Sequence, residues 1–255
     1  MLQSLKKRIS FRTKVKIRNR LNDLRGLLCF NNLDKLAQVY KTDKFGKHFY
    51  TPHYQFHFSK FKYKKFKMLE IGVGGHDNPI AGGPSLRMWK RFFPFAQIYA
   101  LDIFDKSFFQ EKRVRIFQGS QVDKVFLNKM LEETGELDII LDDGSHVNEH
   151  VIESFKILFP KLKQGGIYVV EDCQTSYHTG YFGGDNKNFN NLNTSMGFFK
   201  SLVDGLNSEE YGIDGYERNY YDKNIISIHF YHSLIFIYKG NNNEGASSNI
   251  AFSRD

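Results

Sequence analysis

The chain has 255 residues, of which 41% are hydrophobic and 16% aromatic, so it can bury a sizeable core. Nine basic residues and one acid lie between Lys6 and Arg25, which accounts for the formal net charge of +8 and leaves the remainder nearly neutral. The sequence has two cysteines without metal-type spacing, which argues against a zinc cluster or a disulfide framework. It has no apolar run long enough to span a bilayer. It also lacks the apolar core of a signal peptide, which argues against secretion. We therefore expect a cytoplasmic protein.

Residues 1–60 are expected to form a basic helical extension. Its basic part favours a solvated helix or a partly ordered arm, and the alternative is a contact with another subunit or peripheral contact with an anionic membrane. Nucleic acid is disfavoured because no later stretch combines a stacking platform with interleaved basic residues. A helix is predicted over Leu33–Tyr40, with Asn31 or Asn32 as its cap. The aromatic, histidine-rich stretch 50–58 either packs this extension against the main domain or forms a lid over a ligand.

The main domain, expected over residues 61–240, opens with a strand that runs into a glycine turn, Gly72-Val73-Gly74-Gly75. Such a turn lets the backbone approach a ligand closely, although Gly-x-Gly alone is a weak signal. A long loop, 76–84, separates the turn from the next helix, for which Ser85 is the expected cap. NAD and FAD are disfavoured, because a tight pyrophosphate cradle would enter its helix directly.

The second predicted strand, 97–101, ends in an acid, Asp102. An acid at this strand end, about thirty residues after the glycine turn, is placed to hydrogen-bond ribose hydroxyls. The alternative is an acid in a surface turn. A third strand, 114–117, precedes a helix over 124–133 that Asp123 caps and Gly135 ends.

Two acidic motifs follow the fourth and fifth predicted strands. Asp142-Asp143-Gly144-Ser145-His146 follows the strand 137–141, and Glu171-Asp172 follows the strand 167–170, with a helix over 147–163 between them. A right-handed crossover makes the two strands parallel, so both acidic ends emerge at the sheet edge where α/β proteins bind ligands. The sequence therefore predicts a divalent-metal site with a base beside it.

The last part of the chain begins with an irregular stretch, from Cys173 to about Ser195, long enough to predict a functional or disordered loop. A helix over 196–206, a hairpin of strands 225–230 and 234–238, and a loose tail over 241–255 follow. The expected fold is therefore α/β: a doubly wound, Rossmann-like sheet of seven strands with the last strand antiparallel.

This pattern resembles the class I S-adenosylmethionine-dependent methyltransferases. Residues 69–75 resemble their first motif, and Asp102 resembles their ribose-binding acid. A narrower likeness, to the metal-dependent sugar O-methyltransferases of macrolide biosynthesis (the mycinamicin VI 2''-O-methyltransferase type), rests on Ala81-Gly82-Gly83, Ser85-Leu86-Arg87-Met88-Trp89, Leu101-Asp102-Ile103 and the two acidic motifs. It spans roughly residues 33–179 and leaves the basic arm and the region after Tyr181 uncovered, so the choice of substrate is not implied.

The resemblance assigns roles to the acids and the histidine at the two strand ends. Mg²⁺ would be held by Asp143, Glu171 and Asp172, and His146 would be the general base. S-adenosylmethionine would be contacted by Glu70, Gly72, Gly74 and Asp102, with Gln121 near the adenine.

Asp142 points to the opposite strand face from Asp143. We therefore expect it to contact the methionine part of the cofactor or to cap the next helix. Simpler interpretations stay open for three of the residues: Glu171 and Asp172 could each cap a turn, and His146 could be a structural turn histidine.

The predicted function is Mg²⁺-dependent transfer of a methyl group from S-adenosylmethionine to a sugar hydroxyl of a glycoside, glycan or nucleotide sugar. The acceptor would be a carbohydrate-containing small molecule and the enzyme a homo-oligomer. A catechol-like phenol is the rival acceptor, because it also offers two neighbouring oxygens to the metal. A non-catalytic subunit that binds the cofactor or a partner enzyme is the alternative from another class; the intact acids and histidine argue against it.

Overall fold

The computed structural model describes residues 10–246, so the expectations for Lys6, Lys7 and Arg8 and for the tail beyond residue 246 lie outside it. The chain divides into two compact units, Met1–Gly119 and Ser120–Asp255. The predicted domain boundaries, 1–60, 61–240 and 241–255, stay predictions. Among the described residues, no helix combines the length and the apolar character needed to cross a membrane.

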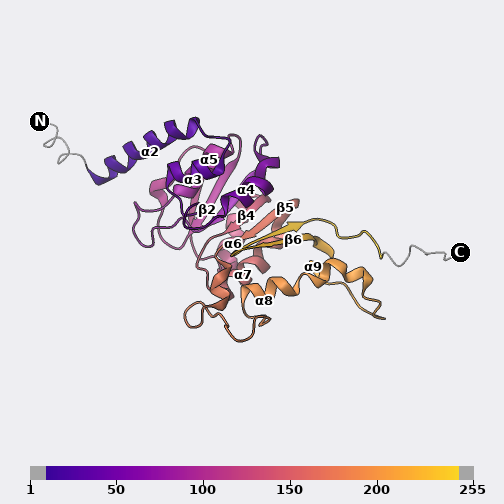
Figure 1. Cartoon of the computed structure of the whole chain (residues 1–255). Helices are drawn as coiled ribbons and strands as arrows, with labels where there is room; N and C mark the ends of the chain where they lie inside the picture. The colour runs from indigo at the N-terminus through magenta and orange to yellow at the C-terminus, as the bar shows by residue number, and fades with distance from the viewer. Residues whose placement is uncertain (1–9, 247–255) are drawn as a thin grey trace, which may run out of the picture. The chain divides into compact units, whose positions relative to one another are not determined.

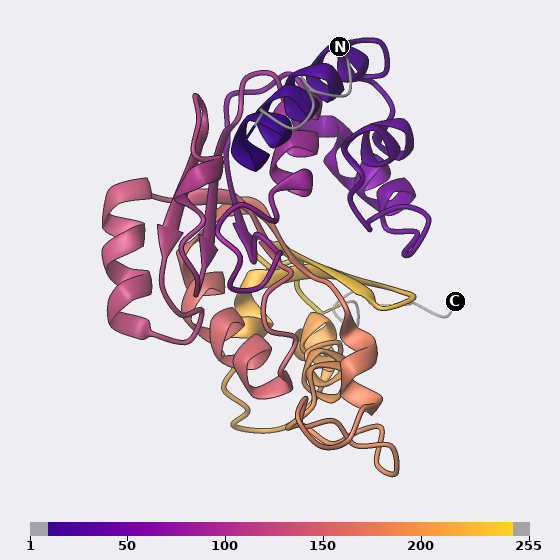
Figure 2. The ribbon, with the colours of Figure 1, turned by 90° about the vertical axis from the view of Figure 1, so that its left-hand side faces the viewer.

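The first unit contains the helices α2 (Phe11–Leu27), α3 (Leu33–Tyr40), α4 (Thr51–Phe58) and α5 (Pro84–Phe92) (Figure 1). Ser10 caps α2 by accepting a hydrogen bond from the backbone N–H of Thr13. Asn32, one of the two predicted caps, caps α3 by accepting a hydrogen bond from the backbone N–H of Lys35. Lys41 ends this helix in the left-handed conformation. α3 packs against α2, α4 and α5, which lie together in Figure 2.

The start of α5 differs from the prediction, because Ser85 is not its cap. Gly83 precedes the helix at φ 76° and Pro84 takes its first position. Proline suits this position because the first N–H groups of a helix have no partner within it and the proline φ is already helical. Ser85 is instead buried in the first turn.

The three strands of the first unit are parallel and lie in the order β3-β2-β1. They are β1 (Lys67–Ile71), β2 (Gln97–Asp102) and β3 (Val114–Gln118). Ile71 pairs with Leu101, so the glycine turn after β1 and Asp102 at the end of β2 emerge at one edge. β1 and β2 are buried along almost their whole length, as is typical of parallel strands covered on both faces.

The second unit contains four strands in the order β4-β5-β7-β6. They are β4 (Leu137–Asp142), β5 (Leu162–Val170), β6 (Ile225–Tyr231) and β7 (Leu234–Lys239). β4 and β5 are parallel, whereas β7 runs antiparallel to both β5 and β6. The prediction of seven strands in a mixed sheet with the last strand antiparallel is therefore confirmed.

The helices of the second unit are α6 (Lys124–Thr134), α7 (Asn148–Leu158), α8 (Ser195–Ser201) and α9 (Tyr220–Asn224) (Figure 1). Asp123 caps α6 and Gly135 ends it, as predicted. α7 ends before the predicted residue 163, because Pro160 lacks an N–H group and its ring clashes with the preceding helical turn. β5 then starts at Leu162 and includes the two glycines expected to close the helix, and α8 is likewise shorter than predicted.

Aromatic side chains fill the core of each unit. In the first, Trp89 of α5 meets Tyr54 of α4 edge-on, with ring centroids 5.1 Å apart, so the stretch 50–58 packs against α5. In the second, Phe155 of α7 is fully buried and contacts Phe159, Tyr168 and Phe199. Aromatic pairs in these geometries add stability beyond the burial of their area.

Phe155→Ala is expected to lower the free energy of unfolding by about 3–5 kcal/mol, because it leaves a cavity inside the aromatic core of the second unit. Chemical denaturation followed by circular dichroism measures the change. Phe95→Ala is the matched control: this ring is 54% exposed, and its loss should change stability by about 0.5 kcal/mol or less. Equal losses in the two variants would contradict the assignment of Phe155 to the core.

Candidate active site

The glycine turn after β1 is held by hydrogen bonds to the end of β2. The N–H of Gly72 donates to the carbonyl of Leu101 at 2.8 Å, and the N–H of Val73 donates to Oδ2 of Asp102 at 2.9 Å. Gly72 and Gly74 have φ values of 91° and 76°, a conformation that glycine adopts without strain. The structure thus brings together Gly72, Gly74 and Asp102, three of the residues predicted to contact the cofactor.

Asp102 uses both carboxylate oxygens to order the backbone around it. Its Oδ1 accepts from the N–H of Phe104 at 2.9 Å, in addition to the contact of Oδ2 with Val73. A carboxylate offers about four acceptor positions, so two remain for ribose hydroxyls. Asp102 therefore orders both its own turn and the glycine turn, and its contact with ribose hydroxyls stays a prediction beside the alternative of a turn acid.

Glu70 is fully buried near the end of β1 and pairs with a lysine that the sequence did not single out. Lys44 Nζ lies 3.6 Å from Glu70 Oε1, and both side chains are about 1% exposed or less. Removing one partner of a buried pair leaves an uncompensated charge, which is strongly destabilising. Glu70 therefore has a structural role here, and its contact with the cofactor stays a prediction.

A second missed residue, Lys106, holds the loop that follows the glycine turn. Its buried ammonium group donates to the carbonyls of His76, Asn78 and Ala81, at 2.6 to 3.2 Å. The loop folds back so closely that a Cβ atom on Gly82 would lie 2.3 Å from the carbonyl oxygen of Gly74. Nothing in the local sequence around Lys106 indicates this role, because its hydrogen-bond acceptors are backbone carbonyls, which every residue has whatever its side chain.

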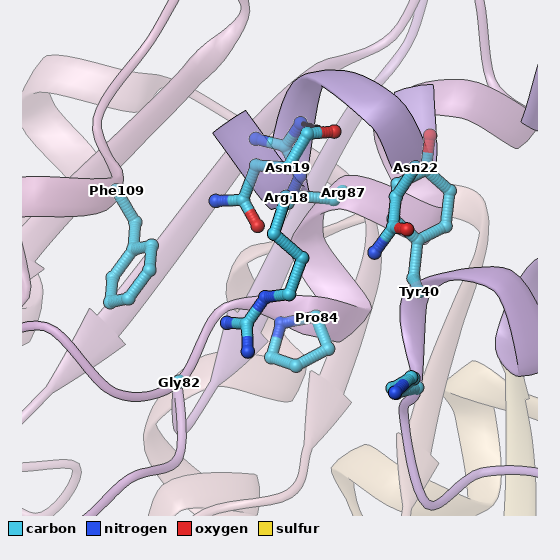
Figure 3. A pocket seen from close by; sticks show the side chains of 9 residues that line it. Arg18, Asn19, Asn22, Tyr40, Gly82, Pro84, Arg87 and Phe109 are labelled. Carbon is cyan, nitrogen blue, oxygen red and sulfur yellow. Dashed lines mark hydrogen bonds between the residues drawn. The ribbon is translucent and has the colours of Figure 1, made fainter. Parts of the chain in front are cut away.

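The first unit also contains a pocket of about 190 Å³ that includes one residue of this loop, Gly82 (Figure 3). The pocket is lined by Arg18, Asn19, Asn22, Tyr40, Lys41, Gly82, Pro84, Arg87 and Phe109. None of the residues predicted to act in catalysis or to bind the cofactor or metal lines it.

In the second unit, Asp142 and Gln121 form a buried pair at the end of β4. Gln121 Nε2 donates to both carboxylate oxygens of Asp142, at 3.2 and 3.3 Å, while its Oε1 accepts from the N–H of Ser145 at 2.8 Å. Asp142 Oδ1 also accepts from the N–H of Gly144. Asp142 does not cap α7, which begins after Val147 without a side-chain cap. Its contact with the cofactor stays a prediction, as does that of Gln121.

Burial raises the pKa of Asp142 to about 7, against the opposing effects of His146, Gly144 and Gln121. The carboxyl group is 1% exposed, so its charged form loses most of its hydration. Because the folded-state pKa lies above that of the unfolded chain, the contribution of Asp142 to stability is fully present below about pH 4 and is lost as the pH rises through 7.

Three side chains at the ends of β4 and β5 could hold a metal ion. Ligand atoms of Asp143, His146 and Asp172 all lie within 4.8 Å of one another. His146 Nε2 is 3.5 Å from Asp172 Oδ2 and 3.9 Å from Asp143 Oδ1. Each side chain is about a fifth exposed, so a ligand can reach the group from solvent.

This group fits a divalent cation in its donor set. Two carboxylates that follow the ends of adjacent parallel strands supply the oxygen ligands that Mg²⁺ prefers, and a small number of protein ligands leaves positions for water or substrate. His146 and Asp172 have φ values of 56° and 53°, a conformation uncommon outside glycine that clusters at functional sites. Glu171 is buried and not part of this group, so its role as a third metal ligand stays a prediction.

The long segment after Asp172 is ordered by one buried side chain, Asn148 at the start of α7. Its Nδ2 donates to the carbonyls of Thr175 and Phe182, and its Oδ1 accepts from the N–H of Ser195 and from the hydroxyl of Ser176. All four hydrogen-bonding positions of the amide are used. The sequence predicted a functional or disordered loop, and the structure shows that both ends of it are attached to α7.

The sequence of the chain is similar to those of known methyltransferases. No family model matches the chain. It is 47% identical to mycinamicin VI 2''-O-methyltransferase of Micromonospora griseorubida and 46% identical to demethylmacrocin O-methyltransferase of Streptomyces fradiae, in each case over 84% of its own length and 54% of the relative's. The chain thus spans about half the length of these curated relatives.

A solved structure of the MycE methyltransferase of the mycinamycin pathway, in complex with Mg and SAH, matches 88% of this chain and 58% of MycE. The TM-score is 0.83 at 46% sequence identity, which shows that the two share one fold. A second MycE structure, which also holds mycinamycin VI, matches with a TM-score of 0.82.

Replacement of Asp142 by Asn, which keeps the shape but not the charge, is expected to stabilise the ligand-free protein at high pH. Near pH 4 the two proteins should be about equally stable. Above about pH 8 the variant should be more stable by up to about 4 kcal/mol, because each unit between the pKa of Asp142 in the folded and in the unfolded chain corresponds to about 1.4 kcal/mol. Urea denaturation across this range measures the difference, with Asp204→Asn as an exposed control. A difference between variant and wild type that does not change with pH would contradict the raised pKa.

The fold of the chain and its similarity over 84% of its length identify mycinamicin VI 2''-O-methyltransferase, demethylmacrocin O-methyltransferase and MycE as its homologues.

Proposed function

We propose that the chain is a Mg²⁺-dependent O-methyltransferase that moves a methyl group from S-adenosylmethionine to a sugar hydroxyl. The observation that carries the proposal is the convergence of Asp143, His146 and Asp172 at the ends of two adjacent parallel strands. A binding module has no need for two carboxylates and an imidazole in such a group. The glycine turn and Asp102 supply the features that an adenosine-containing cofactor requires.

Asp143 and Asp172 would hold the metal. When bound, Mg²⁺ would act as a Lewis acid toward the acceptor oxygens and favour loss of the hydroxyl proton. His146 Nε2 would accept that proton, since an imidazole takes up and releases protons near neutral pH. The hydroxyl oxygen would form its new bond to the methyl carbon as the bond from that carbon to sulfur breaks, which gives an ether and S-adenosylhomocysteine.

A sugar is favoured over a catechol-like phenol as the acceptor. The relatives are named for reactions on mycinamicin VI, demethylmacrocin and rhamnosyl tetracenomycin C, and one MycE structure holds mycinamycin VI. The long segment after Asp172 is rich in asparagine and glycine and places many amide groups near the chain surface, in keeping with a polar acceptor. A screen of glycosides, glycans and nucleotide sugars with labelled S-adenosylmethionine, with and without Mg²⁺, tests the acceptor class directly.

Two further expectations belong to the proposal. A homo-oligomer is predicted, which light scattering of the full chain measures. A cytoplasmic location is also predicted, in keeping with the two unpaired cysteines, Cys29 and Cys173.

Asp143→Asn is expected to abolish Mg²⁺-dependent methyl transfer, because it removes one charged oxygen ligand and with it several kcal/mol of transition-state stabilisation. Calorimetry should show that the variant still binds S-adenosylmethionine but no longer binds Mg²⁺ with the affinity of the wild type. Asp204→Asn, a change of the same kind at an exposed position, should leave both properties unchanged. Full activity of Asp143→Asn in the presence of EDTA would rule out the metal site.

His146→Ala is expected to lower turnover by roughly 10²–10⁴, the usual contribution of a general base, with cofactor binding retained. The pH dependence of turnover separates this role from a structural one. If His146 is the base, the residual turnover of His146→Ala should rise with hydroxide concentration, because hydroxide then accepts the proton in its place. His232→Ala, at an exposed turn between β6 and β7, is the matched control. Near-wild-type turnover of His146→Ala across the neutral range would remove this histidine from the mechanism.

A further inference from the structure

The helix α2 is attached to the rest of the first unit through one face only. Val15, Asn22 and Gly26 are its buried residues. Gly26 lies so close to α3 that a Cβ atom there would be 2.8 Å from the hydroxyl of Tyr40. Figure 3 shows Asn22 beside Tyr40, on the side of α2 that faces the pocket.

Polar contacts fix this orientation of α2. Arg87 of α5 donates to the carbonyl of Asn19 at 3.1 Å and also pairs with the carboxylate of Asp23. Arg91 donates to the carbonyl of Asp23 at 3.2 Å, and the hydroxyl of Tyr40 donates to Asp23 Oδ1 at 3.0 Å. The helix therefore cannot rotate to bury its other face without breaking these bonds.

The opposite face of α2 carries a stripe of large apolar side chains. Ile17, Leu21 and Leu24 of α2 and Leu28, which follows its last residue in a helical conformation, are spaced at intervals of four, three and four residues. This spacing places them on one side of the helix. Their exposed fractions are 46%, 51%, 63% and 91%. Scattered exposed apolar residues need no explanation, but a continuous stripe marks an interaction surface.

Basic residues border this apolar stripe on both sides. With 3.6 residues per turn, Lys14 and Arg25 fall along one border and Arg20 along the other. The single acid of α2, Asp23, lies on the inner side, where Arg87 and Tyr40 take up its carboxylate. The exposed surface of α2 is therefore apolar along its centre and positively charged along its edges.

We propose that α2 docks on an anionic phospholipid surface, with the stripe of Ile17, Leu21, Leu24 and Leu28 inserted among the acyl chains. Long basic side chains at the edges of such a helix reach the lipid phosphates while their methylene stems cover apolar surface. A second copy of α2 is a poor partner for the same stripe, because basic side chains would face one another along both borders, where paired helices place opposite charges. The charge pattern thus selects a negatively charged partner.

The test is co-sedimentation of the full chain with phosphatidylcholine vesicles that contain or lack phosphatidylglycerol. We expect binding to the anionic vesicles, weak binding to the neutral ones, and loss of binding at high salt. Leu21→Ser combined with Leu24→Ser should weaken vesicle binding at least about tenfold. Replacing Arg20 by Gln should weaken it by roughly fivefold, the contribution of one basic residue near an anionic surface.

Val125→Ser combined with Ile226→Ser is the matched control, because it makes the same chemical change at exposed positions of α6 and β6. These substitutions should leave vesicle binding unchanged, and thermal unfolding checks that all variants fold. Equal binding to both kinds of vesicle, no binding at all, or equal loss in the control variant would overturn the proposal. A dimer that dissociates only in the Leu21 and Leu24 variant, without vesicle binding, would assign the stripe to a second copy instead.

Discussion

The site depends on the parallel pairing of β4 with β5. Asp142 pairs with Val170 in this register, so the next residues along both strands, Asp143 and then Glu171 and Asp172, leave the sheet at the same edge. A shift of one residue in either strand would turn its side chains to the other face. The backbone hydrogen bonds of two buried strands thus determine whether two carboxylates can share one cation, and the left-handed conformations of His146 and Asp172 complete the arrangement.

Much of this arrangement could be predicted from the sequence, because buried strands and the acids that end them leave a local pattern. The strand–helix–strand unit, the glycine turn and Asp102 were predicted on that basis, and their geometry agrees. The ends of α7 and α8 could not be placed as well, since a three-residue 3₁₀ turn at Pro160 follows α7 and a 3₁₀ segment over Asp204–Glu210 follows α8. Ser85 was misplaced for a related reason: proline can begin a helix without a capping side chain.

The residues that sequence reasoning missed are those whose partners lie far away along the chain. Lys44, Lys106 and Asn148 are all buried polar groups that bind a carboxylate or backbone carbonyls from distant segments. Such contacts leave no spacing pattern, because a carbonyl is present at every position. They belong to the tertiary structure, and they pair with Glu70 in β1 and hold the loop after the glycine turn and the long segment after Asp172 in place.

Asn148 also has a consequence for how enzymes of this architecture could diverge. Because one amide serves Thr175, Ser176, Phe182 and Ser195, the two ends of the long segment and the first turn of α7 form one cooperative unit. The exposed stretch between these anchors, residues 186–190, does not contact Asn148 and is held from the surface side, where Lys200 donates to the carbonyl of Phe189 and to Oδ1 of Asn190. Insertions and substitutions there could reshape an acceptor site while leaving the acids and histidine at the strand ends undisturbed, as loops on a rigid scaffold do.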